Sequence, residues 1–91
     1  MVQFKSLEEV EKFVEDNSFD IMTDIVENNG VEVLSLTVAW IESGYNDDEI
    51  DKEYKLEELY DMETLLEDAN VRIEDGNSWC DERETLLVTL L

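Results

Sequence analysis

The chain contains no histidine and no proline, and it has only one cysteine, Cys80, and three glycines. Without histidine, nucleophile pairs of the Ser-His and Cys-His kinds are excluded, as are zinc sites of the usual His/Cys type. A single cysteine cannot form an intrachain disulfide, which favours a reducing compartment. The absence of proline and the scarcity of glycine suit a mainly helical chain.

Positive charge is scarce too. Only six of the 91 residues are Lys or Arg, against 26 Asp or Glu, so the formal net charge is -20. So few cations could not hold a nucleotide, and no Gly-rich phosphate loop occurs. The charge argues against direct binding to nucleic acid or to an anionic membrane surface, and it favours a basic protein as the partner.

The density of this charge approaches that of DNA. B-DNA carries one negative charge per ~1.7 Å of axis, so a charge of -20 corresponds to about 10 base pairs, or ~34 Å of duplex. A compact chain of this length should have a diameter of roughly 30 Å. The protein is therefore expected to carry about the charge of a DNA segment of its own length.

No apolar run approaches the ~18 residues of a membrane span, and the first residues, Met1 to Ser6, do not resemble a signal peptide. Hydrophobic residues make up 43% of the chain and include two Trp, which is too apolar for a disordered acidic tail. We therefore expect one folded domain over residues 1–91, located in the cytoplasm of a bacterium or of an infected cell.

The hydrophobic periodicity predicts an α+β fold that is mostly helical, with about four helices and a short C-terminal antiparallel β-hairpin or small sheet; the alternative is an all-α fold. The expected helices cover residues 7–16, 19–28, 31–43 and 47–69. The third segment could also be a strand, because it is rich in β-branched residues. In the tail, Asp75-Gly76 predicts a hairpin turn. A final helix capped by Asp81 is the alternative there, and Val2 to Phe4 could add an edge strand.

Local signals mark the ends of these elements. Ser6 and Glu9 fit a capping box at the start of the first helix. Gly30 suits the left-handed cap that ends a helix, here the second one. In the fourth helix, a broad apolar stripe that includes Tyr60 and Leu65 is expected to face the core, and Tyr54 shares one face with Ile50.

Carboxylates recur at helical spacing along three acidic stripes. Neighbours at i, i+3 or i+4 on a helix lie ~5–6 Å apart, close to the spacing of phosphates along one DNA strand. Two such helices side by side would present two rows of negative charge. The first stripe is Glu8, Glu11 and Glu15; the second is Asp20, Asp24 and Glu27; the third comprises Asp47, Asp48, Asp51, Glu57, Glu58, Asp61 and Asp68.

Catalytic and cofactor sites find little support. The pairs Glu8/Glu11 and Glu58/Asp61 have the spacing used by magnesium-dependent hydrolases, but acidic pairs are frequent by chance in so acidic a chain. The segment from Asp47 has acids at three positions of a calcium loop, but Lys52 occupies the place of the required glycine. Ser18 is read as a helix cap rather than as a cofactor attachment site. We expect no enzyme, no cofactor and no specific metal site.

Size and charge resemble those of small phage or plasmid proteins that imitate DNA. The resemblance implies an inhibitor that occupies the DNA-binding site of a host restriction, CRISPR, repair, nucleoid or transcription protein, so the expected partner is a basic DNA- or RNA-binding protein. The alternatives are an acidic adaptor for a basic or hydrophobic partner, and a halophilic protein. Trp79 could serve as an apolar anchor at the interface. The apolar tail, Leu86 to Leu91, could support a homodimer.

Overall fold

The computed structural model describes residues 3–18, 20–40, 47–76 and 83–91, of which residues 47–51 by their backbone alone. Two helices and four strands follow one another in these segments. Their order is α1 (Leu7–Asn17), β1 (Met22–Asn28), β2 (Val31–Ala39), α2 (Asp47–Leu66), β3 (Val71–Asp75) and β4 (Arg83–Leu90).

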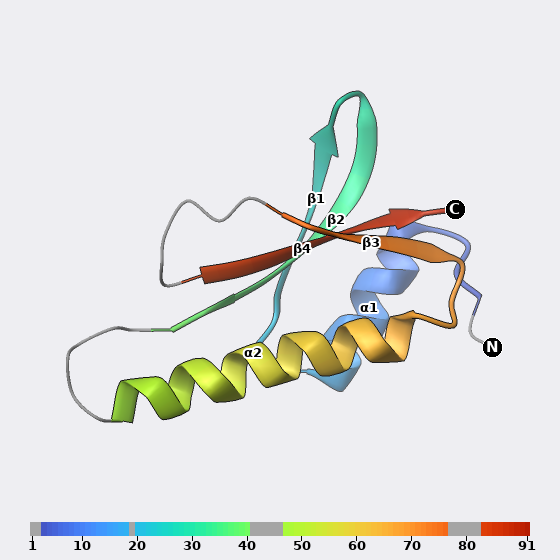
Figure 1. The fold of residues 1–91 in the computed structure, drawn as a ribbon. Helices are drawn as coiled ribbons and strands as arrows, with labels where there is room; N and C mark the ends of the chain where they lie inside the picture. The colour runs from blue at the N-terminus through green and yellow to red at the C-terminus, as the bar shows by residue number, and fades with distance from the viewer. Residues whose placement is uncertain (1–2, 19, 41–46, 77–82) are drawn as a thin grey trace.

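The four strands form one antiparallel sheet in the order β1-β2-β4-β3. Both helices lie on the same side of this sheet (Figure 1), so the molecule has two layers, one helical and one of strands. The other face of the sheet carries no helix of the described chain, and it is called the open face below. The turn end of the β1–β2 hairpin diverges from β4 (Figure 1), because β2 pairs with β4 only from Leu34 to Ala39.

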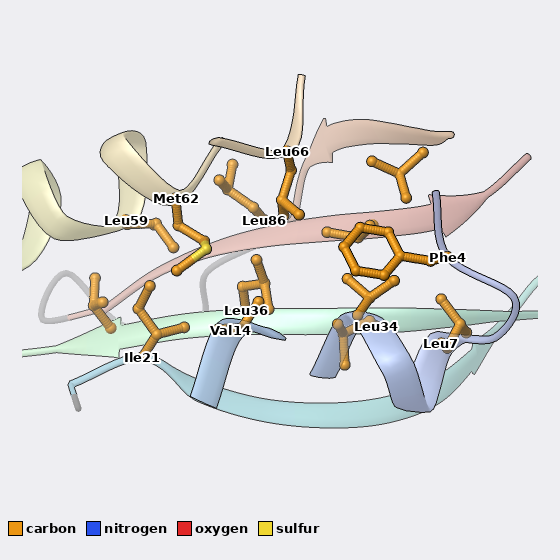
Figure 2. Close-up of a cluster of buried hydrophobic side chains, with 14 of the residues drawn as sticks. Phe4, Leu7, Val14, Ile21, Leu34, Leu36, Leu59, Met62, Leu66 and Leu86 are labelled. Atoms are coloured by element: carbon orange, nitrogen blue, oxygen red, sulfur yellow. The ribbon is translucent and has the colours of Figure 1, made fainter. Parts of the chain in front are cut away.

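The core lies between the helices and the sheet (Figure 2). Side chains alternate across a strand, so every second residue of β2 and β4 points to the helices. α1 contributes Leu7, Val10 and Val14, and α2 contributes Leu59, Met62 and Leu66. From the sheet they meet Leu34, Leu36, Val38, Leu86 and Val88, all fully buried. This apolar seam fixes which sides of the two helices remain in solvent.

The first helix forms where the sequence predicts it. Glu9 N–H donates to Ser6 Oγ at 3.3 Å, and Glu9 Oε1 accepts from Lys5 N–H at 2.9 Å. Both contacts satisfy backbone donors that a helix start leaves without partners. The capping box is therefore confirmed, with its return bond made to Lys5 instead of Ser6.

The predicted helices over residues 19–28 and 31–43 are wrong, and with them the mostly helical fold. These segments contain β1 and β2, which pair antiparallel from Met22↔Thr37 to Asn28↔Val31. β-Branched residues make up three of the seven residues of β1 and four of the nine of β2, and they pack better on a pleated surface than in a helix. β2 is a central strand with burial on both faces, since Val33 on the open face is only 4% exposed. Its long apolar run therefore imitated a buried helix.

Asn29 and Gly30 make the turn between these strands. Asn29 has φ 55° and Gly30 has φ 81°. Two successive residues in the left-handed region are the mark of a type I′ hairpin turn, whose twist matches that of the flanking strands. Gly30 thus adopts the predicted positive φ, but it turns a hairpin and does not end a helix.

The second half of the chain follows the prediction more closely. α2 is continuous, and β3 and β4 form the expected C-terminal hairpin, so the alternative of a final helix is wrong. The predicted tight turn at Asp75-Gly76 is also wrong. Gly76 N–H donates to Thr85 O at 2.9 Å and thereby extends the ladder. The turn of this hairpin lies outside the described residues.

The N-terminal segment is held by a side chain instead of a strand. Phe4 N–H donates to Asn70 Oδ1 at 2.7 Å, and Asn70 Nδ2 donates to Phe4 O at 2.8 Å. The Asn70 amide thus pairs with the backbone as a strand would. Gln3 and Phe4 are not in a strand, so the predicted edge is wrong where the structure describes it. Neither of the two described helices is long and apolar enough to cross a membrane.

Replacing Gly30 should expose the constraint at the β1–β2 turn. Nothing lies within 4 Å of a Cβ added there, so only the backbone conformation opposes a side chain. We expect Gly30→Ala to lower the free energy of unfolding by about 1 kcal/mol, and Gly30→Asn to lower it less, because Asn tolerates positive φ. Urea denaturation of the three proteins measures this. Equal losses for Ala and Asn would contradict the type I′ turn.

Candidate functional site: an acidic pocket beside the second helix

Negative charge is concentrated on the helical layer. α1 contains five carboxylates and α2 nine, which is fourteen of the 26 in the chain. On the described part of the open face, the strand register places two carboxylates, Asp24 and Glu74, and two cations, Arg72 and Arg83. The formal charge of that face is therefore balanced, and the excess lies on the helical side.

The helical side is hollowed where the α1–β1 connection meets α2. An open pocket of ≈ 470 Å³ lies there. Four carboxylates line it: Asp20 from the connection, and Glu57, Glu58 and Asp61 from α2. The remaining lining residues are Asn17, Ser18, Tyr54, Met62 and Leu65. We call this the acidic pocket.

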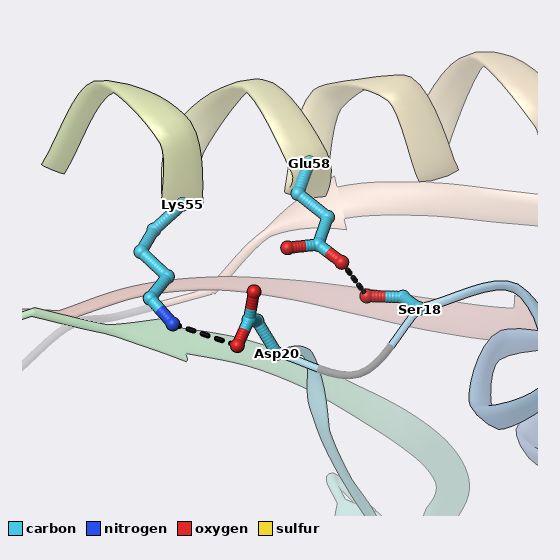
Figure 3. Close-up of polar contacts among 4 residues, drawn as sticks. All are labelled: Ser18, Asp20, Lys55 and Glu58. Atoms are coloured by element: carbon cyan, nitrogen blue, oxygen red, sulfur yellow. Dashed lines mark hydrogen bonds and ion pairs between the residues drawn. The ribbon is translucent and has the colours of Figure 1, made fainter. Parts of the chain in front are cut away.

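Two polar contacts join its walls (Figure 3). Lys55 Nζ lies 2.8 Å from Asp20 Oδ1, and Ser18 Oγ donates to Glu58 Oε1. Lys55 and Glu58 both point from α2 towards the α1–β1 connection, which explains how that segment is held against the helix. The hydrogen bond from Lys55 lowers the pKa of Asp20 below its ordinary value of 3.8, and the positive charge of Lys55 lowers it further.

Glu57 and Asp61 behave differently. Both are exposed, and neither makes a hydrogen bond or ion pair with any described residue. They stand four residues apart on α2, where like charges destabilise a helix by about 0.2–0.5 kcal/mol per pair. A cation from outside would relieve that repulsion. A single metal ion is not favoured, because the described residues contain no group of three or more His, Cys, Asp or Glu that could hold one.

Apolar side chains stand at both ends of the α2 wall. Tyr54 is 68% exposed and Leu65 is 52% exposed. The sequence predicted Leu65 in the core, but the seam with the sheet is narrower than the predicted stripe, since it uses Leu59, Met62 and Leu66. The excess apolar residues therefore border the pocket.

Tyr60 marks the opposite flank of α2. It is 47% exposed, although the sequence predicted it in the core. Partial burial raises the pKa of the Tyr60 hydroxyl above 10.0, and the negative charges of Glu84, Asp75 and Glu63 raise it further. Carboxylates therefore surround α2 on this side as well as at the pocket.

The predicted stripes have three different outcomes. On α1, Glu8 and Glu15 are exposed and Glu11 is half-buried, as expected of an outward row. The second stripe is dispersed, because it lies on β1 and its approach: Asp24 and Glu27 are an odd number of residues apart in a strand and point to opposite faces. Asp20 alone joins the pocket.

On α2, the third stripe brings Glu57, Glu58 and Asp61 together at the pocket, while Asp68 is exposed beyond the helix end. The side chains of Asp47, Asp48 and Asp51 lie outside the described ones, as does all of Trp79. Sequence reasoning missed Lys55 as a partner of Asp20, and it assigned Ser18 only a capping role. It had no signal for these pairings, since Ser18 and Glu58 are 40 positions apart.

Comparison with known protein families, with curated proteins and with solved structures finds no match for this chain. The function must therefore be argued from the geometry and charge of the chain itself.

The Asp20–Lys55 pair should make a pH-dependent contribution to stability. Since the pKa of Asp20 is lowered in the folded protein, the contribution is present above pH 3.8 and is lost as the pH falls through the lower folded value. We expect Asp20→Asn to lower the free energy of unfolding by less than about 1 kcal/mol near pH 6, because the pair is partly exposed, and to lower it less near pH 3. Urea denaturation at both pH values tests this, with Asp24→Asn as the charge-matched control. A loss for Asp20→Asn that is the same at both pH values would contradict the ion pair.

Tyr60 reports the potential around α2. The tyrosine ionisation of the wild-type protein minus that of Tyr60→Phe gives the titration of Tyr60 alone, followed by ultraviolet absorbance. We expect its midpoint above 10.0, and we expect added salt to move it down, because salt screens the neighbouring carboxylates. A midpoint at or below the ordinary value, unmoved by salt, would contradict the proposed surroundings of Tyr60.

Proposed function

We propose that this protein binds a basic protein surface that otherwise binds nucleic acid, and that it occupies this surface in place of DNA. The helical layer is the binding face, and the acidic pocket lies within it. The expected setting remains the cytoplasm of a bacterium or of an infected cell.

The observation that carries this proposal is the one-sided placement of charge. Fourteen carboxylates belong to the two helices, while the described charges of the open face balance. A charge that served solubility alone would have no reason to avoid one face. A face of one sign attracts a basic partner from a distance and orients it during the encounter.

The dimensions support the same proposal. The longest extent of the molecule is 43 Å, and B-DNA of that length carries about 25 charges at one per ~1.7 Å. The chain carries -20, so its linear charge density is about four-fifths of that of DNA. The exposed row Glu53, Glu57 and Asp61 on α2 repeats every four residues, which is about 6 Å along the helix axis. Helices held on a sheet present such rows with little ordering cost on binding.

Three substitutions on α2 should separate a located binding face from bulk charge. The row variant carries Glu53→Gln, Glu57→Gln and Asp61→Asn, and the control variant carries Asp24→Asn, Glu32→Gln and Glu74→Gln. Both lose three charges, but the control charges lie on strands or on the hairpin end. We expect the row variant to bind its partner more weakly by about 1–3 kcal/mol, or roughly 5- to 150-fold, and the control variant to change little.

The immobilised wild-type chain first captures proteins from a host lysate. Excess duplex DNA then elutes the partner, and the eluted partner is titrated with the wild type, the row variant and the control variant. We expect the duplex DNA to displace the captured partner from the immobilised chain, because DNA and the chain would compete for one site on the partner. A captured partner that excess duplex never displaces would contradict imitation of DNA. Equal weakening by both variants would show that only net charge matters.

A further inference from the structure

The acidic pocket and the apolar side chains beside it lie on one surface of α2. Tyr54 and Leu65 are eleven residues apart, or about 16 Å along the helix axis, and both line the pocket together with the carboxylates between them. Singly exposed apolar residues need no explanation, but here two large ones border the same concave, charged surface. Apolar contacts beside charged ones are typical of protein docking sites.

The carboxylates of this surface are arranged for more than one cation. Asp20 is paired with Lys55 and Glu58 with Ser18, whereas Glu57 and Asp61 have no partner among the described residues. Described carboxylates do not converge closely enough to hold a metal ion. A ligand with several separated positive charges therefore fits better than one compact ion.

From these observations we infer that the acidic pocket docks a basic polypeptide segment in which at least two Arg or Lys side chains lie between two apolar side chains about 16 Å apart. The cations contact Glu57 and Asp61, and the apolar side chains pack on Tyr54 and Leu65. The inference rests on the proposed function and specifies it: the partner's basic surface contains such a segment. An extended chain advances ~3.3 Å per residue and turns every second side chain to the same face. Two apolar residues six positions apart therefore share one face and lie about 20 Å apart along the backbone, with two cations between them on that face. Their side chains lean inward to contact Tyr54 and Leu65.

A synthetic probe tests the geometry directly. It is an acetylated and amidated heptapeptide with leucine at positions 1 and 7 and arginine at positions 3 and 5, titrated into the ¹⁵N-labelled protein. We expect amide shifts in α2 from Tyr54 to Leu65 and at Ser18 and Asp20. An isomer with both leucines at one end should bind about fivefold more weakly, since it leaves one apolar contact unmade. Glutamine in place of the arginines should weaken binding by about three- to tenfold.

Variants of the protein supply the second readout. The double variant Tyr54→Ser/Leu65→Ser should bind the heptapeptide at least about fivefold more weakly. The control Tyr60→Ser removes an exposed apolar side chain from the other flank of the same helix and should change the affinity for the heptapeptide little. All three side chains are largely exposed, so the fold should tolerate their loss. Unchanged amide spectra away from α2 will verify this.

Two results would overturn the inference. One is that the isomer, or spermine, binds as tightly as the probe peptide with the same pattern of shifts, because the surface would then recognise charge alone. The other is a pattern of shifts on the open face. If the heptapeptide does not bind while the row variant still binds the captured partner more weakly than the wild type, the docking geometry is wrong and the proposed function stands. If the row variant has no effect, the proposed function itself is wrong.

Discussion

The apolar contact between two acidic helices and one face of the sheet determines how the charge of this chain is distributed. Each helix can bury only the side that carries Val10 and Val14, or Leu59, Met62 and Leu66. Most of the described carboxylates of both helices are therefore turned towards solvent on the same side of the molecule. Repulsion among them opposes compactness, and the fully buried seam of Leu34, Leu36 and Leu86 must offset it.

The acidic pocket is a consequence of the same packing. α1 ends where its chain must cross α2 to enter β1, and Ser18 and Asp20 in this crossing meet Glu58 and Lys55. These contacts fix the connection against the helix but leave Glu57 and Asp61 without partners among the residues that the structure describes. The side chains that the narrow seam cannot accommodate, Tyr54 and Leu65, remain beside them. Charge and apolar surface thus meet at one place for reasons that begin in the core.

How far the sequence predicts this structure depends on whether a signal is local. The capping box at Ser6 and the long helix α2 depend on neighbours within one or two turns, and both were predicted. β1 was mistaken for a helix because acids at Asp20, Asp24 and Glu27 happen to fall at helical spacing, and β2 because its long apolar run resembles a buried helix. Asn29-Gly30, a strong hairpin signal between two β-branched segments, was the available evidence against those helices.

The candidate site was predictable only in part, for the same reason. Glu57, Glu58 and Asp61 form a row that any helix over this segment would produce. Their proximity to Ser18 and Asp20 depends on how the α1–β1 connection passes α2. No residue spacing in the sequence predicts this. The exposure of Tyr54 and Leu65 could not be predicted either, because the width of a buried stripe is set by the partner surface rather than by the helix.

The central claim is that the negative potential of this protein is one-sided. Paramagnetic hexaamminechromium(III), a trivalent cation without directional ligands, will gather where the potential is most negative and will broaden nearby amide signals. The account predicts selective broadening along α1 and α2 and around the acidic pocket, with β4 and the open-face residues of β2 spared, and loss of this selectivity as salt is added. Equal broadening over both faces of the sheet at low salt would contradict it.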